Sequence, residues 1–201
     1  MKPARDIPIP DRMRYLPRDK RGYPIPFIVF RDTDGNPHFT INDDVRRAFV
    51  IANDRCAICN HHLSRGRWFV GGPASAFDPH GAYIDPPLHH ECAEYALQVC
   101  PYLAAPSYSK LVDGKTLDMD KAGGPVLLDT NVDNERPDVF VAAMTLGQRF
   151  TPDGYIVPKR PFRRIEFWKD GKRLAIRRGD VRKGDVTQAE KLRDFMKGAR
   201  A

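Results

Sequence analysis

The sequence predicts an α+β fold, in which small antiparallel sheets pack with a few helices around one metal-binding element. Three features indicate this class: two closely spaced pairs of Cys and His, short apolar runs separated by turn residues, and a helical stretch that begins at the second Cys/His pair. With 201 residues and 41% hydrophobic content, the chain is long enough to bury one moderate core.

The two Cys/His pairs have the spacing of zinc ligands. Cys56 and Cys59 form a C-x2-C turn, and His89 and Cys92 follow after 29 intervening residues. Zn²⁺ in proteins prefers thiolate and imidazole ligands arranged as two close pairs. The alternative is a set of unpaired core cysteines, which accounts for one cysteine better than for two spaced pairs. Four protein ligands would leave no open position, so we expect a structural zinc ion.

Residues 1–26 are predicted to form a proline-rich extended arm. Proline fixes φ and removes a backbone donor, which excludes a regular helix here. Interspersed apolar residues such as Met13, Leu16 and Tyr23 predict that the arm lies along the domain surface. The six prolines are Pro3, Pro8, Pro10, Pro17, Pro24 and Pro26.

A zinc-binding α+β core is predicted over residues 27–136. Residues 27–30 and 38–41 should form a hairpin around a turn at 34–36. Asn42 is the expected N-cap of a helix over residues 43–53, with Val45, Phe49 and Val50 on one side.

After the C-x2-C turn, residues 67–70 are expected to pair with residues 82–84. The next helix should begin near Leu88, so that His89 and Cys92 share a face in its first turn. His90 should then point to the surface, and Cys100 lies about 12 Å along the helix, too far for the same ion. Knuckle, hairpin and ligand-bearing helix, in this order, are typical of a treble-clef zinc finger.

Residues 137–201 are predicted to form a basic, β-rich region that belongs to the same compact unit. Strands are expected over residues 139–144, 155–157 and 163–168, and Asp170-Gly171 should supply a two-residue turn. A final helix is expected from Thr187, with Leu192, Phe195 and Met196 on its apolar side.

The positive charge of the chain is concentrated near its C-terminal end. The net charge is +7, and residues 159–200 alone hold 15 Lys and Arg against 6 Asp and Glu. This asymmetry predicts a polyanionic partner, DNA or RNA, although a basic face that only keeps the protein in solution would look the same. The expected contacts are Arg163, Arg164, Lys172, Arg173, Arg177, Arg178, Arg182 and Lys183, with Trp168 as a stacking surface.

The leading interpretation is therefore a non-enzymatic, zinc-stabilised protein that binds nucleic acid. One alternative is an enzyme acting on nucleic acid or nucleotides near residues 72–80. An HNH-like nuclease shares the treble-clef frame, but only Asp78, His80 and Asp85 are available there, without the paired motif. A nucleobase deaminase is disfavoured because its C-x2-C should follow H-x-E.

Another alternative is a protein-interaction module, connected with phage or host proteins, that uses the proline-rich arm. No run of about 18 apolar residues occurs, which excludes a transmembrane helix. The first residues lack the apolar stretch of a secretory signal, so we expect a cytoplasmic protein with reduced thiols.

The chain also resembles a group of uncharacterised bacterial and phage treble-clef proteins. The resemblance rests on the stretches at residues 21–27, 56–59, 72–76, 86–93, 100–103 and 165–172, and the P-P-x-H-x-x-C-A run at 86–93 is the most specific. It implies that His89, not His90, is the ligand, and it places Cys100 in a recurrent C-P-aromatic-L run. Asn60 stands where the group usually has glycine, but asparagine tolerates the same left-handed turn.

Overall fold

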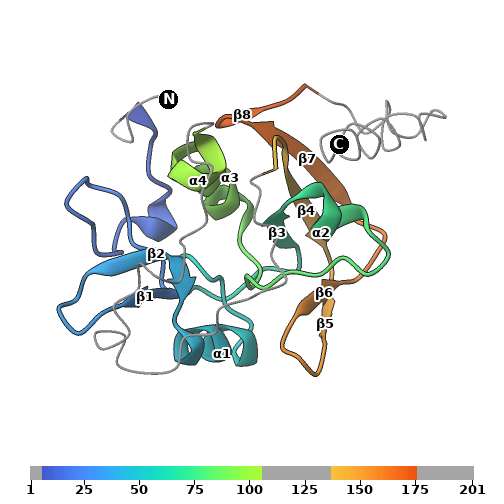
Figure 1. Ribbon diagram of the computed structural model, residues 1–201, viewed down its shortest axis with the longest axis horizontal. Helices are drawn as coiled ribbons and strands as arrows, with labels where there is room; N and C mark the ends of the chain where they lie inside the picture. Colours follow the sequence, from blue (N-terminus) through green and yellow to red (C-terminus); the bar gives the residue numbers. More distant parts are fainter. Residues whose placement is uncertain (1–5, 106–136, 176–201) are drawn as a thin grey trace, which may run out of the picture.

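The computed structural model describes residues 6–105 and 137–175. It confirms a mixed fold of helices and small antiparallel sheets (Figure 1). The predicted helix from Thr187 lies outside the described residues. In chain order the elements are η2 (Asp11–Met13), β1 (Val29–Arg31), β2 (Pro37–Asn42), α1 (Asp44–Ala52), β3 (Arg67–Gly71), α2 (Pro73–Phe77), α3 (His90–Val99), α4 (Pro101–Ala104), β4 (Phe140–Thr145), β5 (Gln148–Phe150), β6 (Ile156–Pro158), β7 (Arg164–Lys169) and β8 (Lys172–Arg173).

The largest sheet has the strand order β3-β4-β7-β8, and all its pairs are antiparallel. The expected pairing of β3 with residues 82–84 is wrong, because β3 pairs with β4 over its whole length. Tyr83 instead bridges Ile156. Strand β4 is buried at nearly every position, so pairing with it removes more apolar surface from water than a three-residue partner would.

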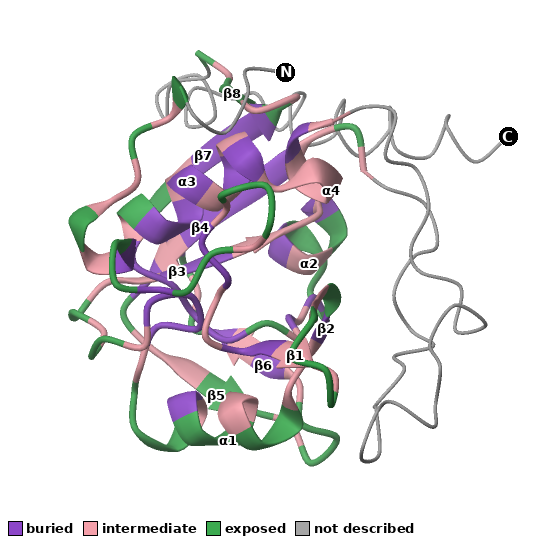
Figure 2. Ribbon diagram, turned by 90° about the vertical axis from the view of Figure 1, so that its left-hand side faces the viewer, coloured by how far each residue is buried: buried purple, intermediate pink, exposed green. Residues whose placement is uncertain are grey.

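Alternate residues of β4 pack into two different clusters. Phe140 and Ala142 join the main core with residues of α3, whereas Val141 and Ala143 pack with Ala76 of α2. Because successive side chains of a strand point to opposite faces, α3 and α2 cover opposite faces of the sheet. Figure 1 shows the sheet between these two helices, and Figure 2 shows burial concentrated in β3, β4, β7 and α3.

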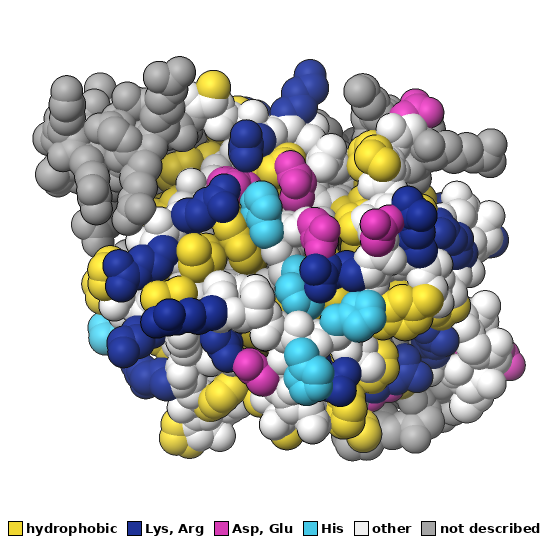
Figure 3. Space-filling model, turned by 180° about the vertical axis from the view of Figure 1, so that it is seen from behind, with side chains coloured by type: hydrophobic (Ala, Val, Ile, Leu, Met, Phe, Trp, Pro, Cys, Tyr) yellow, Lys and Arg dark blue, Asp and Glu magenta, His cyan; other side chains and the backbone are white. Residues whose placement is uncertain are grey.

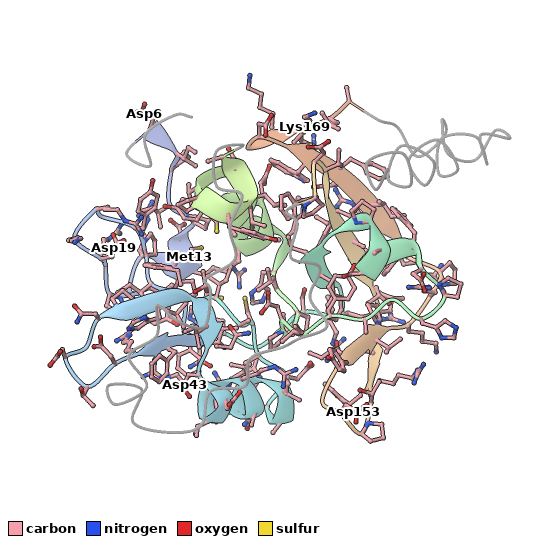
Figure 4. The ribbon with its side chains drawn as sticks, in the orientation of Figure 1. Asp6, Met13, Asp19, Asp43, Asp153 and Lys169 are labelled. Carbon is pink, nitrogen blue, oxygen red and sulfur yellow. The ribbon has the colours of Figure 1, made fainter. Side chains whose placement is uncertain are left out.

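The N-terminal segment contributes to the core rather than only lying along the surface. Met13 and Leu16 are buried in the main cluster, with Ile7 and Ile9 packed against it. Figure 4 shows Met13 beside α3. The segment is also not extended throughout, since η2 supplies one turn of 3-10 helix. Prolines at its edges permit this turn because they remove donors only outside it.

The β1–β2 hairpin and α1 form as predicted, with small shifts. The turn contains Gly35 at φ +82°, a conformation that favours glycine. Asp43, not Asn42, is the N-cap, and its side chain accepts a hydrogen bond from the Arg46 amide. The predicted apolar side of α1 is wrong in part: Val50 is fully buried, but Val45 is 80% exposed.

The β7–β8 hairpin confirms the predicted Asp170-Gly171 turn. Both residues have positive φ, at 49° and 73°, as a two-residue type I′ connection requires. The turn places Lys169 and Lys172 opposite each other at the end of the hairpin, where Figure 4 labels Lys169.

Candidate metal centre

The first pair of candidate ligands lies in a tight turn after α1. Asn60 closes this turn at φ 50°, which confirms that asparagine adopts the left-handed conformation here. Its amide donates to the Cys56 carbonyl, and the Cys56 amide donates to the His61 carbonyl, at 2.9 Å each. These hydrogen bonds direct both sulfurs to one side of the turn.

The second pair comes from the start of α3. His89 is the N-cap residue, with extended backbone angles, and Cys92 lies in the first turn. The entry to the helix is fixed by two contacts: the Ala57 amide donates to the Pro87 carbonyl, and Trp68 and Leu88 form an antiparallel bridge. The knuckle and the helix start are thus held together by backbone hydrogen bonds.

The four donor atoms form one compact, buried cluster. Those of Cys56, Cys59, His89 and Cys92 all lie within 4.8 Å of one another, and the side chain of His89, the most exposed member, is only 6% accessible. The Cys59 Sγ–His89 Nδ1 distance is 3.4 Å. Edges of a tetrahedral Cys3His zinc site measure about 3.5–3.8 Å, so the cluster could hold a metal ion after small adjustments.

The buried side chains of the cluster shift one another's pKa values. Hydrogen bonds from Cys56 and Cys92 lower the pKa of Cys59, whereas hydrogen bonding to Cys56 and Cys59, together with burial, raises the pKa of Cys92. Burial lowers the pKa of His89, but hydrogen bonds to the two sulfurs outweigh it and raise the pKa to about 10. Without a metal, only some of these sulfurs can be ionised together; a dication removes that limit.

Groups around the cluster fix the orientation of His89. Its Nε2 lies 2.9 Å from the His62 carbonyl oxygen, so Nε2 carries a proton and donates, and Nδ1 is the nitrogen that faces the sulfurs. Such an outer hydrogen bond sets the tautomer of a metal-binding histidine. Arg12 pairs with Glu91 beside this ring, and the Tyr15 hydroxyl donates to the Cys59 carbonyl.

Sequence reasoning did not identify these supporting residues. Arg12 and Tyr15 are separated from their partners by 79 and 44 residues respectively. Neither residue belongs to a motif, and the proline-rich segment that carries them gave no signal for a position beside the metal centre.

His90 is only partly the surface residue that the sequence predicts, because its side chain is 33% exposed. Its Nε2 lies 2.9 Å from Glu166 Oε1, and its ring packs on Trp68 with centroids 4.2 Å apart. The helix points His90 away from the cluster as expected, but the sheet lies in that direction. The hydrogen bond from His90 helps to lower the pKa of Glu166, against the opposing and larger effect of burial.

Cys100 lies outside the metal cluster, at the junction of α3 and α4. It is the C-cap of the first helix and the N-cap of the second. Burial raises the pKa of its thiol, which keeps it protonated and unreactive.

The predicted nucleic-acid contacts fall into three groups. Arg163, Arg164, Lys172 and Arg173 are exposed, while Arg177, Arg178, Arg182 and Lys183 lie outside the described residues. Trp168 is only 3% exposed, so its role as a stacking surface is wrong. Alternation along β7 points its ring at the core, where Nε1 lies 3.4 Å from Glu166 Oε2.

Glu166 forms ion pairs with two of the exposed arginines. Arg164 and Arg173 lie 3.4 and 3.5 Å from its Oε1, with side chains 56% and 55% exposed. The buried carboxylate holds the inner sides of both guanidinium groups, and their outer sides face solvent.

No other cluster of three or more His, Cys, Asp or Glu side chains forms within residues 6–105 and 137–175. Asp78 and His80 are linked only through the His80 amide, and the Asp85 carboxylate accepts from Asn42. Across the same residues, no helix combines the length and apolar character needed to cross a membrane.

No family model, curated protein or solved structure matches the chain. The resemblance to uncharacterised bacterial and phage proteins therefore stays a prediction.

Proposed function

We propose that the chain is a zinc-stabilised protein that binds nucleic acid through a basic surface on β7 and β8, rather than an enzyme. The observation that carries the metal assignment is the donor set: four buried side chains place their donor atoms within 4.8 Å of one another, and four protein ligands on one ion would leave no open position for a substrate. A Cys3His set of this kind suits Zn²⁺, and a closed site is structural.

The proposed zinc element is a treble clef. The knuckle supplies Cys56 and Cys59, and α3 carries Cys92. The antiparallel bridge between Trp68 and Leu88 takes the place that a hairpin has in a treble clef. A metal ion in this position would tie the start of α3 to the knuckle, and through α3 it would support one face of the sheet.

The binding surface is proposed from the exposed cations of the β7–β8 hairpin. The described members are Arg163, Arg164, Lys169, Lys172 and Arg173, all exposed, and the one acid facing Arg164 and Arg173 is buried. Exposed cations of this kind suit the phosphates of DNA or RNA. No contact in the described residues favours the nuclease alternative or presents the proline-rich arm as a free ligand.

The test is fluorescence anisotropy with DNA and RNA over a range of salt concentrations. Replacing Arg164, Lys172 and Arg173 with Gln should weaken binding and reduce the slope of log K against log salt by roughly 2 to 3, since each lost phosphate contact contributes about 0.7–0.9.

A matched variant replaces Lys20, Arg149 and Lys159, which are also exposed, with Gln. It removes the same charge elsewhere and should bind nearly as the parent does. Equal effects of both triple variants, or no binding at low salt by the metal-loaded protein, would contradict the proposal.

A further inference from the structure

An aromatic side chain is exposed and held in place over the cysteine knuckle. Tyr15 is 58% exposed, although its hydroxyl donates to the Cys59 carbonyl. Its ring meets His61 edge to face, with centroids 5.3 Å apart. The ring is thus anchored at its polar end and along one edge. An anchored aromatic ring can pack on a ligand with little loss of side-chain entropy.

Tyr15 lies beside the cysteines of the metal cluster, and Arg55 is the cation nearest to its hydroxyl. Arg55 donates to the Asn60 carbonyl and lies 3.0 Å from His62 Nε2, and no acid pairs with it in the described part of the chain. The nearby acids are both paired, Asp11 with Arg14 and Glu91 with Arg12. Figure 3 shows one face of the molecule on which histidine side chains lie among Lys, Arg, Asp and Glu near the middle.

This combination favours one class of ligand. A flat exposed ring suits a nucleobase, and the neighbouring cations suit the phosphates on either side of it. Bases in a duplex are already stacked, so only an unpaired base can reach the ring. An uncharged aromatic ligand would not use Arg55, and an acidic peptide would not use the ring face.

We propose that Tyr15 and His61 form a stacking site for a base of single-stranded nucleic acid, with Arg55 beside them as a phosphate contact. The inference rests on the proposed function and adds a preference for unpaired strands. It places base stacking at the metal knuckle and the bulk of phosphate binding on β7 and β8.

The test compares three probes by fluorescence anisotropy: a single strand of about ten nucleotides, made as DNA and as RNA, an abasic strand with the same number of phosphates, and a duplex. The parent protein should prefer the base-bearing strand over the abasic one by about 5- to 150-fold, the range that one stacked base supplies. The ratio of DNA to RNA affinity shows which strand is the better ligand.

Tyr15→Leu should abolish the preference for bases while leaving duplex affinity unchanged. Tyr15→Phe, which keeps the ring, should retain it. Phe150→Leu is the matched control, because Phe150 is another exposed aromatic, at 47%, but lies on β5. It should behave as the parent does.

A fluorescent variant keeps the test decisive if Tyr15→Leu fails to bind metal. Both native tryptophans are buried, at 4% and 3% exposed, so Tyr15→Trp adds one solvent-exposed reporter. Its emission should be quenched by the base-bearing strand and not by the abasic strand.

Equal affinity of the parent for base-bearing and abasic strands, or a preserved preference in Tyr15→Leu, would overturn the stacking site. Salt-dependent binding through β7 and β8 would survive that result. Absence of binding to every nucleic acid would overturn both proposals.

Discussion

The Cys3His cluster and the four-stranded sheet are two regions whose expected sources of stability differ. In the Cys3His cluster, polar donors are buried within 4.8 Å of one another, an arrangement that a bound cation would make favourable. In β4, by contrast, Phe140, Val141, Ala142 and Ala143 are at most 2% exposed, and apolar burial suffices. Loss of a bound ion should therefore unfold the region around the Cys3His cluster, while apolar burial continues to stabilise the four-stranded sheet.

The two regions meet in the first turn of α3. Cys92 faces the cluster, while His90 reaches Glu166 on β7. This one helical turn carries both a candidate metal ligand and a sheet contact, so it connects the two sources of stability.

The largest expected effect is the loss of a metal ligand. Cys92→Ser should abolish stoichiometric metal binding and lower the free energy of unfolding by several kcal/mol, because metal affinity contributes directly to folding. Cys100→Ser is the control and should keep the metal. Elemental analysis and thermal unfolding measure both quantities. A Cys92→Ser protein with a full complement of metal would refute the ligand set.

A core substitution in the sheet should show the opposite pattern. Phe69, on β3, is 1% exposed and packs on Tyr83. Phe69→Ala should cost about 3–5 kcal/mol of unfolding free energy while the folded protein retains its metal. Denaturant unfolding together with metal analysis checks this, and metal loss parallel to the loss of stability would show that the regions are not separable.

Substitutions of the adjacent residues His89 and His90 should differ in their effect on metal content. His89→Ala removes a metal ligand, whereas His90→Ala should keep the metal and cost about 1–3 kcal/mol, because it removes a partner of the buried Glu166 carboxylate. Metal content separates the two variants even where their midpoints are similar. A metal-free His90→Ala protein would show that the register of α3 at the cluster is wrong.

The smallest effect concerns pH. The pKa of Glu166 lies below its usual value of 4.5, since its hydrogen bonds and charged partners outweigh burial. A lowered folded-state pKa gives stability that is present above 4.5 and is lost as pH falls through the folded value. The stability advantage of the parent over Glu166→Gln should thus shrink on acidification below about pH 4.5. An advantage that grows on acidification would contradict the assignment.

The metal cluster could be predicted from the sequence because its geometry is mostly local. C-x2-C closes one turn, Asn60 permits the left-handed residue, and His89 and Cys92 are fixed by the start of one helix. That the C-x2-C turn and the start of α3 come together could also be predicted, because Zn²⁺ prefers thiolate and imidazole ligands from two such pairs.

Non-local partners could not be predicted in the same way. The partner of β3 begins about 70 residues later along the chain, and residues 82–84 were nearer in sequence with a similar pattern. The helical period gives the direction of His90, but not what lies there. The basic residues around Trp168 indicate a nucleic-acid contact, but not that its ring is buried. Met13 and Leu16 lie in a proline-rich segment, which predicts an extended arm on the domain surface. Proline content does not show that such a segment also contributes side chains to the core.

The most direct measurement is X-ray absorption at the zinc edge, combined with elemental analysis of the purified full chain. The Cys3His assignment predicts about one zinc per chain, with three sulfur neighbours at about 2.3 Å and one nitrogen at about 2.0–2.1 Å. Protein that folds without metal, or a zinc shell containing oxygen from water, would contradict a closed structural site.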